Sequence, residues 1–184
     1  MARAKRESTP ADMVRSLAVI LIPLLIITFL FTRNLGDHPV KEVDWRPVLT
    51  TARQQAPFPV LAPTGLPEGW RATQVVWVPQ GKPYLNGEPS VRNLWKLGFL
   101  NPDNVFVGLS EGDLRPDDLV RDETREGALD GQSTVGDQTW QRWVSPDDRT
   151  RALVASSAKV TTVVSADLPY EALEAYVSTL STSG

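Results

Sequence analysis

The longest apolar run of the chain lies close to its start. Ser16–Thr32 forms seventeen consecutive positions without a charge, most of them Leu, Ile, Val or Phe. A bilayer core about 30 Å thick needs about 20 helical residues, and Met13–Thr32 provides that length if the Arg15 side chain reaches toward the lipid head groups. Residues 13–33 are therefore predicted to form a transmembrane helix that contacts the lipid bilayer through Met13–Thr32.

A cleaved secretory signal and a buried helix of a soluble domain are the alternatives for this run. The exit from the run, Phe29–Leu35, lacks the small residues that a signal-peptidase site requires. A buried helix of this length seldom carries Leu, Ile, Val and Phe on every face. The chain contains no Cys, which excludes lipid attachment to a cysteine. We therefore favour an uncleaved signal anchor.

The charges on either side of the run set its orientation. Four basic residues precede the apolar run, and Arg33 follows it at once; the four are Arg3, Lys5, Arg6 and Arg15. The positive-inside rule places the N-terminus in the cytoplasm and the C-terminal domain outside the plasma membrane. The predicted parts are a basic cytoplasmic head (1–12), the anchor (13–33), a tether (34–43) and an extracytoplasmic domain (44–184).

After the tether, apolar residues recur with the spacing of a helix. They occupy positions i, i+3, i+4 and i+7, at Trp45, Val48, Leu49 and Ala52. Asp44 is placed to act as the N-cap, and a proline in the first turn is tolerated. The pattern predicts an amphipathic helix of two to three turns that ends before Pro57.

The next segments alternate between strand patterns and turns. Leu66–Gly69 fits a type I turn, and the alternation over Arg71–Pro79 predicts a strand with Ala72 and Val78 on one face and Val75 and Trp77 on the other. Further strands are predicted over 91–100, 105–110, 133–144, 150–157 and 159–166, with hairpin turns at 101–104 and 146–149.

The acidic segment 111–131 lacks strand character. We expect it to be the most exposed part of the domain, with at most a turn of helix near Pro116–Val120. A last helix starts at Pro169 and presents one apolar face, made by Leu173, Tyr176, Val177 and Leu180. The predicted fold class is α+β: an antiparallel sheet with a helix at each end and helices covering one face, because consecutive strands lack helical crossovers.

Charge and composition restrict the possible partners. Residues 34–184 carry 14 Lys plus Arg against 20 Asp plus Glu, and an acidic domain is a poor binder of nucleic acid. Without Cys the domain has no disulfides, so its stability must come from the apolar core. All six Trp lie in this domain and supply large side chains for that core.

Several of these features together resemble the DUF4245 family. They are the basic head and anchor, the Val43–Trp45 start of the first helix, the Ala62–Trp70 stretch with its GLPEGW turn, Gly136–Trp140, and the final strand and helix. The resemblance implies a single-pass envelope protein of actinobacteria with no assigned function, and supplies no catalytic or binding residue. In element order the domain is also loosely similar to Mog1/PsbP-type domains, which says nothing of function.

The common catalytic and metal-binding arrangements have no support in the sequence. Nucleophilic triads need a His or Cys in the fold, whereas the chain has no Cys and one His, His38, in the tether. A zinc site would need several such ligands, and no phosphate-binding glycine loop is present. We predict no catalytic residue, no metal site and no cofactor.

Carboxylates are the remaining acid–base candidates. They are Asp113, Asp117, Asp118, Asp122, Glu123 and Glu126, with Asp147 and Asp148 in a later turn. Paired carboxylates can hydrolyse glycosides, and clusters can bind Ca²⁺, although the EF-hand spacing is absent. Arg115, Arg121 and Arg125 interrupt the cluster, which is typical of a solvated loop.

Trp140 and Trp143 are the candidates for a ligand platform. They lie three positions apart on a predicted strand, so their side chains face opposite sides of the sheet. Packing in the core or at its edge is the alternative to recognition.

The sequence favours a membrane-anchored extracytoplasmic binding or interaction domain that is not an enzyme, with an envelope protein or ligand as partner. The alternative is an envelope carrier of lipid or another small ligand, or a carboxylate-based hydrolase. A filled core without a pocket of about 300 Å³ or more would exclude the alternative.

Overall fold

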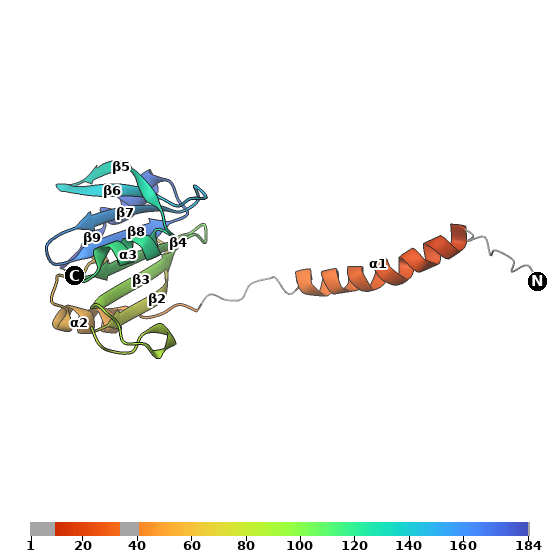
Figure 1. Ribbon diagram of the computed structural model, residues 1–184, viewed down its shortest axis with the longest axis horizontal. Helices are drawn as coiled ribbons and strands as arrows, with labels where there is room; N and C mark the ends of the chain where they lie inside the picture. The colour runs from red at the N-terminus through yellow and green to blue at the C-terminus, as the bar shows by residue number, and fades with distance from the viewer. Residues whose placement is uncertain (1–9, 34–40, 184) are drawn as a thin grey trace, which may run out of the picture. The chain divides into compact units, whose positions relative to one another are not determined.

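The computed structural model describes residues 10–33 and 41–183 (Figure 1). The chain divides between Val40 and Lys41 into two compact units, and each is described by itself. Residues 1–9 of the predicted head, His38 and most of the predicted tether lie outside the described residues. The first unit contains one helix and the second contains the sheet.

Helix α1 (Pro10–Arg33) has 24 residues and includes Pro23. Large apolar side chains lie exposed along it, among them Val19 at 72%, Ile20 at 67% and Leu25 at 66%. Within the described residues, no helix meets the length and apolarity that crossing a membrane requires. The anchor over residues 13–33 stays a prediction.

The second unit is built on a seven-stranded antiparallel sheet in the order β2-β3-β4-β8-β7-β6-β5 (Figure 1). The strands are β2 (Arg71–Val78), β3 (Leu94–Leu100), β4 (Phe106–Gly112), β5 (Ala128–Val135), β6 (Gln138–Val144), β7 (Arg151–Ser156) and β8 (Thr161–Ala166). A second, two-stranded sheet pairs β1 (Ala62–Pro63) with β9 (Leu180–Ser181). The antiparallel α+β class is confirmed.

Helices cover both faces of the large sheet, and the prediction of a single covered face was wrong. The helices are α2 (Arg46–Gln55), α3 (Pro116–Glu123) and α4 (Tyr170–Val177), with a short 3₁₀ turn at Leu85–Gly87. Helices α2 and α4 pack on the larger core, which contains Trp95, Leu97, Leu109, Leu153, Val164 and Leu173. Helix α3 packs on the smaller core, which contains Leu94, Leu119, Val120, Ala152, Val154 and Val163. Neighbours along a strand fall in different cores, as side-chain alternation requires.

Strand β2 does not keep the simple alternation that its sequence suggests. The register shifts between Ala72 and Gln74, so Ala72, Val75 and Trp77 all pack on the larger core. The predicted separation of Ala72 from Val75 and Trp77 was wrong, because a β-bulge adds a residue to one strand and reverses the facing of those beyond it.

The segment 111–131 is not an exposed loop. Strand β4 continues to Gly112, α3 makes two turns, and β5 begins at Ala128. Glu111 has 0% exposure and Leu119 has 4%. The many acidic residues of this segment suggested a loop, but α3 buries one face, with Leu119 and Val120, and carries its carboxylates on the other.

The stretch 133–144, predicted as one strand, folds back on itself. Gly136 takes a φ of 58°. Strands β5 and β6 pair across this turn, from Val135 opposite Gln138 to Ala128 opposite Val144. A glycine takes a positive φ without steric cost, which permits the tight turn here. The predicted hairpins at 101–104 and 146–149 are confirmed, since β3 pairs with β4 and β6 with β7.

Gly98 is predicted to accept a side chain only if the exposed Phe106 ring moves aside. A methyl group at Gly98 would overlap the Phe106 ring, which lies across the adjacent strand. We expect Gly98→Ala to lower the free energy of unfolding by about 1–3 kcal/mol in chemical denaturation, the usual cost of overpacking. In a Phe106→Ala background the same change should cost less than about 1 kcal/mol, because the overlapping ring is gone. Equal costs in the two backgrounds would contradict this packing.

Candidate functional site

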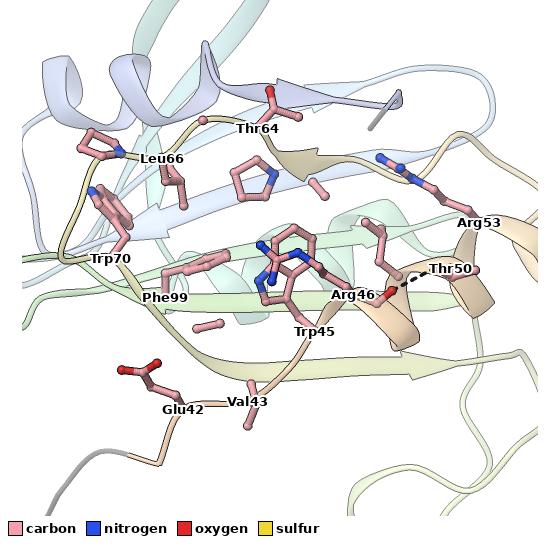
Figure 2. Close-up of a pocket in the computed structure, with 16 residues that line it drawn as sticks. Glu42, Val43, Trp45, Arg46, Thr50, Arg53, Thr64, Leu66, Trp70 and Phe99 are labelled. Atoms are coloured by element: carbon pink, nitrogen blue, oxygen red, sulfur yellow. Dashed lines mark hydrogen bonds between the residues drawn. The ribbon is translucent and has the colours of Figure 1, made fainter.

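A groove of about 730 Å³ opens on the second unit (Figure 2). It is lined by the segment that enters α2, by one side of α2, by the chain from Ala62 to Pro67, and by Trp70, Ala72 and Phe99. This volume falls within the range of small-molecule sites, about 300–1,000 Å³. Below, "the groove" means this hollow.

The entrance to α2 forms one side of the groove. The Val43 N–H donates to the Ala72 carbonyl at 2.9 Å, which fixes the entering chain against β2. Trp45 is the N-cap residue of α2, and the Asp44 carboxylate accepts the Arg46 N–H at 3.2 Å. The helix was predicted correctly; the N-cap position is Trp45, one residue later than predicted, but the Asp44 carboxylate makes the capping bond.

The lip opposite α2 is the Ala62–Trp70 stretch. Its turn lies at Glu68 and Gly69, and Gly69 takes a φ of 90°. The observed turn is therefore Pro67–Trp70, one residue later than the predicted type I turn over Leu66–Gly69, and the positive φ of its third residue, Gly69, belongs to a type II turn. Two of the stretches that carry the family resemblance, Val43–Trp45 at the α2 entrance and Ala62–Trp70 at this lip, meet in the groove.

The floor of the groove is aromatic. Trp45 and Trp70 both meet the buried Phe99 ring edge to face, with ring centroids 5.9 Å and 6.4 Å away. Trp70 also stacks on Tyr176 of α4, at 5.4 Å. Edge-to-face and stacked contacts stabilise aromatic pairs beyond their buried area, so the floor is held in one arrangement.

Two arginines of α2 and one acidic residue provide the charge. The Arg46 guanidinium lies 5.3 Å from the centre of the Trp45 ring, and among the described residues no carboxylate is within salt-bridge distance of it. Arg53 instead donates to the Ser181 carbonyl at 3.1 Å and to the Val60 carbonyl at 3.5 Å. Figure 2 shows Glu42 at the other end of the groove from Arg53.

The wall beyond α2 begins with a segment that we call the strap, residues 58–63. Its centre, Leu61, is held through both backbone groups by buried side chains. The Leu61 N–H donates to the Glu111 carboxylate at 2.8 Å, and the Leu61 carbonyl accepts the Trp95 indole N–H at 3.0 Å. Trp95 and Glu111 are directly opposed in β3 and β4, so one cross-strand pair positions the strap.

Glu111 is the most unusual ionisable group of the fold. It has 0% exposure, and its other oxygen accepts the Thr162 hydroxyl at 2.9 Å. Burial raises the pKa of Glu111 to about 7, although the bonds from Leu61 and Thr162 act in the opposite direction. Sequence reasoning missed Glu111 by placing it in an exposed loop. The alternation of Val107, Leu109 and Glu111 was the signal that the strand continues inward.

Two further hollows are present in the described part of the chain. One, of about 440 Å³, is lined by Leu61, Trp140, Val160 and Thr162 among others. Another, of about 510 Å³, is lined by charged side chains that include Asp122, Arg125, Arg149 and Asp167. The groove is the site that combines an aromatic floor with an unpaired guanidinium.

The predicted carboxylate candidates do not converge on the groove. Asp118 pairs with Arg115 at 2.7 Å and with Arg121 at 3.1 Å, and Glu123 pairs with Lys96 at 2.6 Å. The Asp113 carboxylate accepts a hydrogen bond from the Asn93 side-chain amide at 2.6 Å. A hydrogen bond from the Ser145 hydroxyl lowers the pKa of Asp147. Asp118 and Glu123 thus stabilise α3, whereas Asp113 bonds the chain that enters β3 and Asp147 bonds within the β6–β7 turn. Among the described residues, no group of three or more His, Cys, Asp or Glu could hold a metal ion.

Trp140 and Trp143 face opposite sides of the sheet, as predicted. Trp140 has 5% exposure in the larger core, and Trp143 packs, partly buried, on the smaller core. The indole N–H of Trp140 and the hydroxyl of Tyr176 are buried without a hydrogen-bond partner among the described residues. Neither Trp140 nor Trp143 lines the groove.

Comparison with known proteins gives one match. The family model DUF4245, described as a protein of unknown function, matches residues 5–180. No curated protein and no solved structure matches the chain, so the similarity to Mog1/PsbP-type domains stays a prediction.

The buried carboxyl makes stability depend on pH in a definite direction. The unfolded chain ionises Glu111 near its ordinary value of 4.5, whereas the folded chain holds the proton to about pH 7. Stability should therefore fall as pH rises through this window and then level off, by about 3 kcal/mol in all.

Glu111→Gln should remove this slope, because glutamine does not titrate. The measurement is the free energy of unfolding from chemical denaturation between pH 4 and pH 8, taken as wild type minus variant. Contributions of all other groups cancel in this difference. A flat difference would show that Glu111 is not buried as an acid.

Proposed function

We propose that this chain, which belongs to the DUF4245 family of proteins of unknown function, is a membrane-anchored extracytoplasmic binding module that is not an enzyme. Its ligand, an amphiphile with an apolar body and an anionic head, occupies the groove. The single observation that carries the proposal is the Arg46 guanidinium, which has no described carboxylate partner, beside an aromatic floor in a groove of about 730 Å³.

The anchor is supported by the uncharged run Ser16–Thr32 and by the exposed apolar side chains of α1. An extended apolar surface of this kind marks contact with a membrane or another apolar partner. The basic residues at 3, 5, 6 and 15 support an N-terminus in the cytoplasm. The predicted tether, residues 34–43, is ten residues long, so we expect it to give the domain little reach from the bilayer.

The ligand class follows from the groove's chemistry. Trp45, Trp70 and Phe99 offer flat apolar surface, whereas Arg46 offers up to five N–H donors that suit a carboxylate, phosphate or sulfonate. Arg53 is already held by backbone carbonyls, so Arg46 is the cation available to the ligand. Glu42 at the other end disfavours a second negative group there.

A carrier of lipid or another small ligand is the second hypothesis. It is favoured by the separate hollow of about 440 Å³, which Leu61 also lines, because a carrier must enclose the apolar part of its cargo. The hydrolase alternative has weaker support, since the carboxylates of α3 are engaged with Arg115, Arg121 and Lys96.

The topology is testable because the chain has no native Cys. Ala158→Cys places a single thiol in the exposed turn between β7 and β8, and Ala4→Cys places one in the predicted head. A membrane-impermeant maleimide should label Ala158→Cys in intact cells and Ala4→Cys only after permeabilisation. The reverse pattern would overturn the proposed orientation.

Ligand binding can be tested with two fluorescent probes of similar shape. 1-Anilinonaphthalene-8-sulfonate carries an anionic group, and N-phenyl-1-naphthylamine does not. For a fragment of residues 41–184, Arg46→Ala should weaken binding of the sulfonate about two- to fivefold, as expected for an exposed ion pair. It should leave the neutral probe unchanged, whereas Trp45→Ala should weaken both.

The matched control for Arg46→Ala is Arg121→Ala, which removes an exposed helical arginine that does not line the groove. This control should bind both probes like the wild type. Equal loss of the sulfonate in the two variants would indicate that overall charge, rather than the groove, attracts it.

A further inference from the structure

The position of Glu111 in the sheet isolates its carboxyl from charge. Trp77, Trp95, Glu111 and Thr162 are successive cross-strand partners in β2, β3, β4 and β8. The other members of this row are uncharged. A buried carboxylate without a cationic partner carries a large desolvation cost.

The charged and titratable groups on the surrounding elements are engaged elsewhere or are neutral. Lys96, next to Trp95, lies on the opposite face and pairs with Glu123 at 2.6 Å. On α2, Arg53 bonds the Val60 and Ser181 carbonyls. On α4, Glu174 pairs with Arg142 at 2.7 Å, and burial raises the pKa of Tyr176, which keeps its phenol neutral.

The neutral carboxyl can keep both of its bonding partners. One oxygen accepts the Leu61 N–H, and the other can donate its proton to the Thr162 hydroxyl oxygen, which accepts as readily as it donates. The ionised carboxylate accepts both bonds but remains uncompensated. By linkage, ionisation favours any state in which this group reaches water.

The strap is the element outside the large sheet that bonds directly to Glu111, so it is the part expected to move when water reaches the carboxyl. Leu61 depends on Glu111 and Trp95 for both backbone bonds, and Ala62 and Pro63, which follow it, line the groove. Release of Leu61 would also break the β1–β9 pairing, since Ala62 pairs with Ser181 and Pro63 with Leu180.

We propose that Glu111 is the positioning residue of the groove wall and that its proton controls the strap. The strap is closed and the groove complete while the carboxyl is neutral. Ionisation of the carboxyl opens the strap and lowers the affinity of the groove for its ligand. The link to ligand affinity rests on the proposed function, whereas the motion of the strap does not.

Hydrogen exchange of the full chain in lipid nanodiscs tests the motion. The carboxyl titrates near pH 7 when the strap is closed and near pH 4.5 when it is open. The equilibrium constant for opening the strap should therefore be about tenfold larger at pH 8 than at pH 6. The protection factor of a peptide spanning Leu61–Thr64 should fall by that factor in wild type. Glu111→Gln, which mimics the neutral acid, should remain protected at both pH values. The matched control, Asp117→Asn on α3, should behave like wild type.

A second variant guards against misfolding of Glu111→Gln. Thr162→Val removes a hydroxyl that favours the ionised carboxyl, so the loss of protection should move to higher pH. Protection of Leu61 that is equal at pH 6 and pH 8 in wild type would overturn the proposal.

The ligand arm uses 1-anilinonaphthalene-8-sulfonate in the same experiment. The probe should slow exchange of the strap more at pH 6 than at pH 8 in wild type, and equally at both in Glu111→Gln. If the strap responds to pH but the probe never protects it, the proposed groove function fails while the control of the strap by Glu111 stands. Equal protection by the probe at both pH values in wild type would overturn the link to affinity.

Discussion

The arrangement of the domain depends on how one residue of irregular backbone, Leu61, is bonded. Its N–H and its carbonyl are both taken by side chains of the sheet, from Glu111 and Trp95. These two bonds replace the partners that a strand would have provided, and buried backbone groups need such partners. With Leu61 fixed, Val60 and Ala62 enter the larger core, and β1 reaches β9.

An acid at this position costs stability and still serves the fold. An apolar residue at 111 would avoid the desolvation of a carboxyl but would leave the Leu61 N–H without its acceptor, which costs about 1–3 kcal/mol. A buried polar group that is fully bonded can specify one arrangement among several apolar alternatives. Glu111 thus determines where the strap lies, as well as whether it stays closed.

Sequence reasoning succeeded where local patterns decide the structure and failed where distant segments meet. The helical spacing from Trp45 to Ala52 and the turn residues at 101–104 predicted α2 and a hairpin correctly. The bulge at Ala72–Gln74 was missed because alternation alone does not reveal an inserted residue. Glu111 was missed because its charge led us to assign it to the acidic segment 111–131, although it continues the alternation of strand β4. The groove is lined by residues from three separate parts of the chain, 42–53, 62–72 and 99. No local sequence pattern predicts that these parts come together.

The order of the strands carries a consequence for how the domain folds. Strands β2 to β4 form one meander and β5 to β8 form another, and within the described large sheet only the β4–β8 pairing joins strands that are not consecutive. Each meander closes short loops, whereas the seam brings together groups such as Glu111 and Thr162, which are 51 positions apart. Contacts between residues far apart in the sequence form slowly, because the entropy of closing the loop is lost before the contact contributes favourable free energy. We therefore expect formation of the seam to be the slow step of folding, whereas the two side chains that bond Leu61, Trp95 and Glu111, already lie together in the first meander.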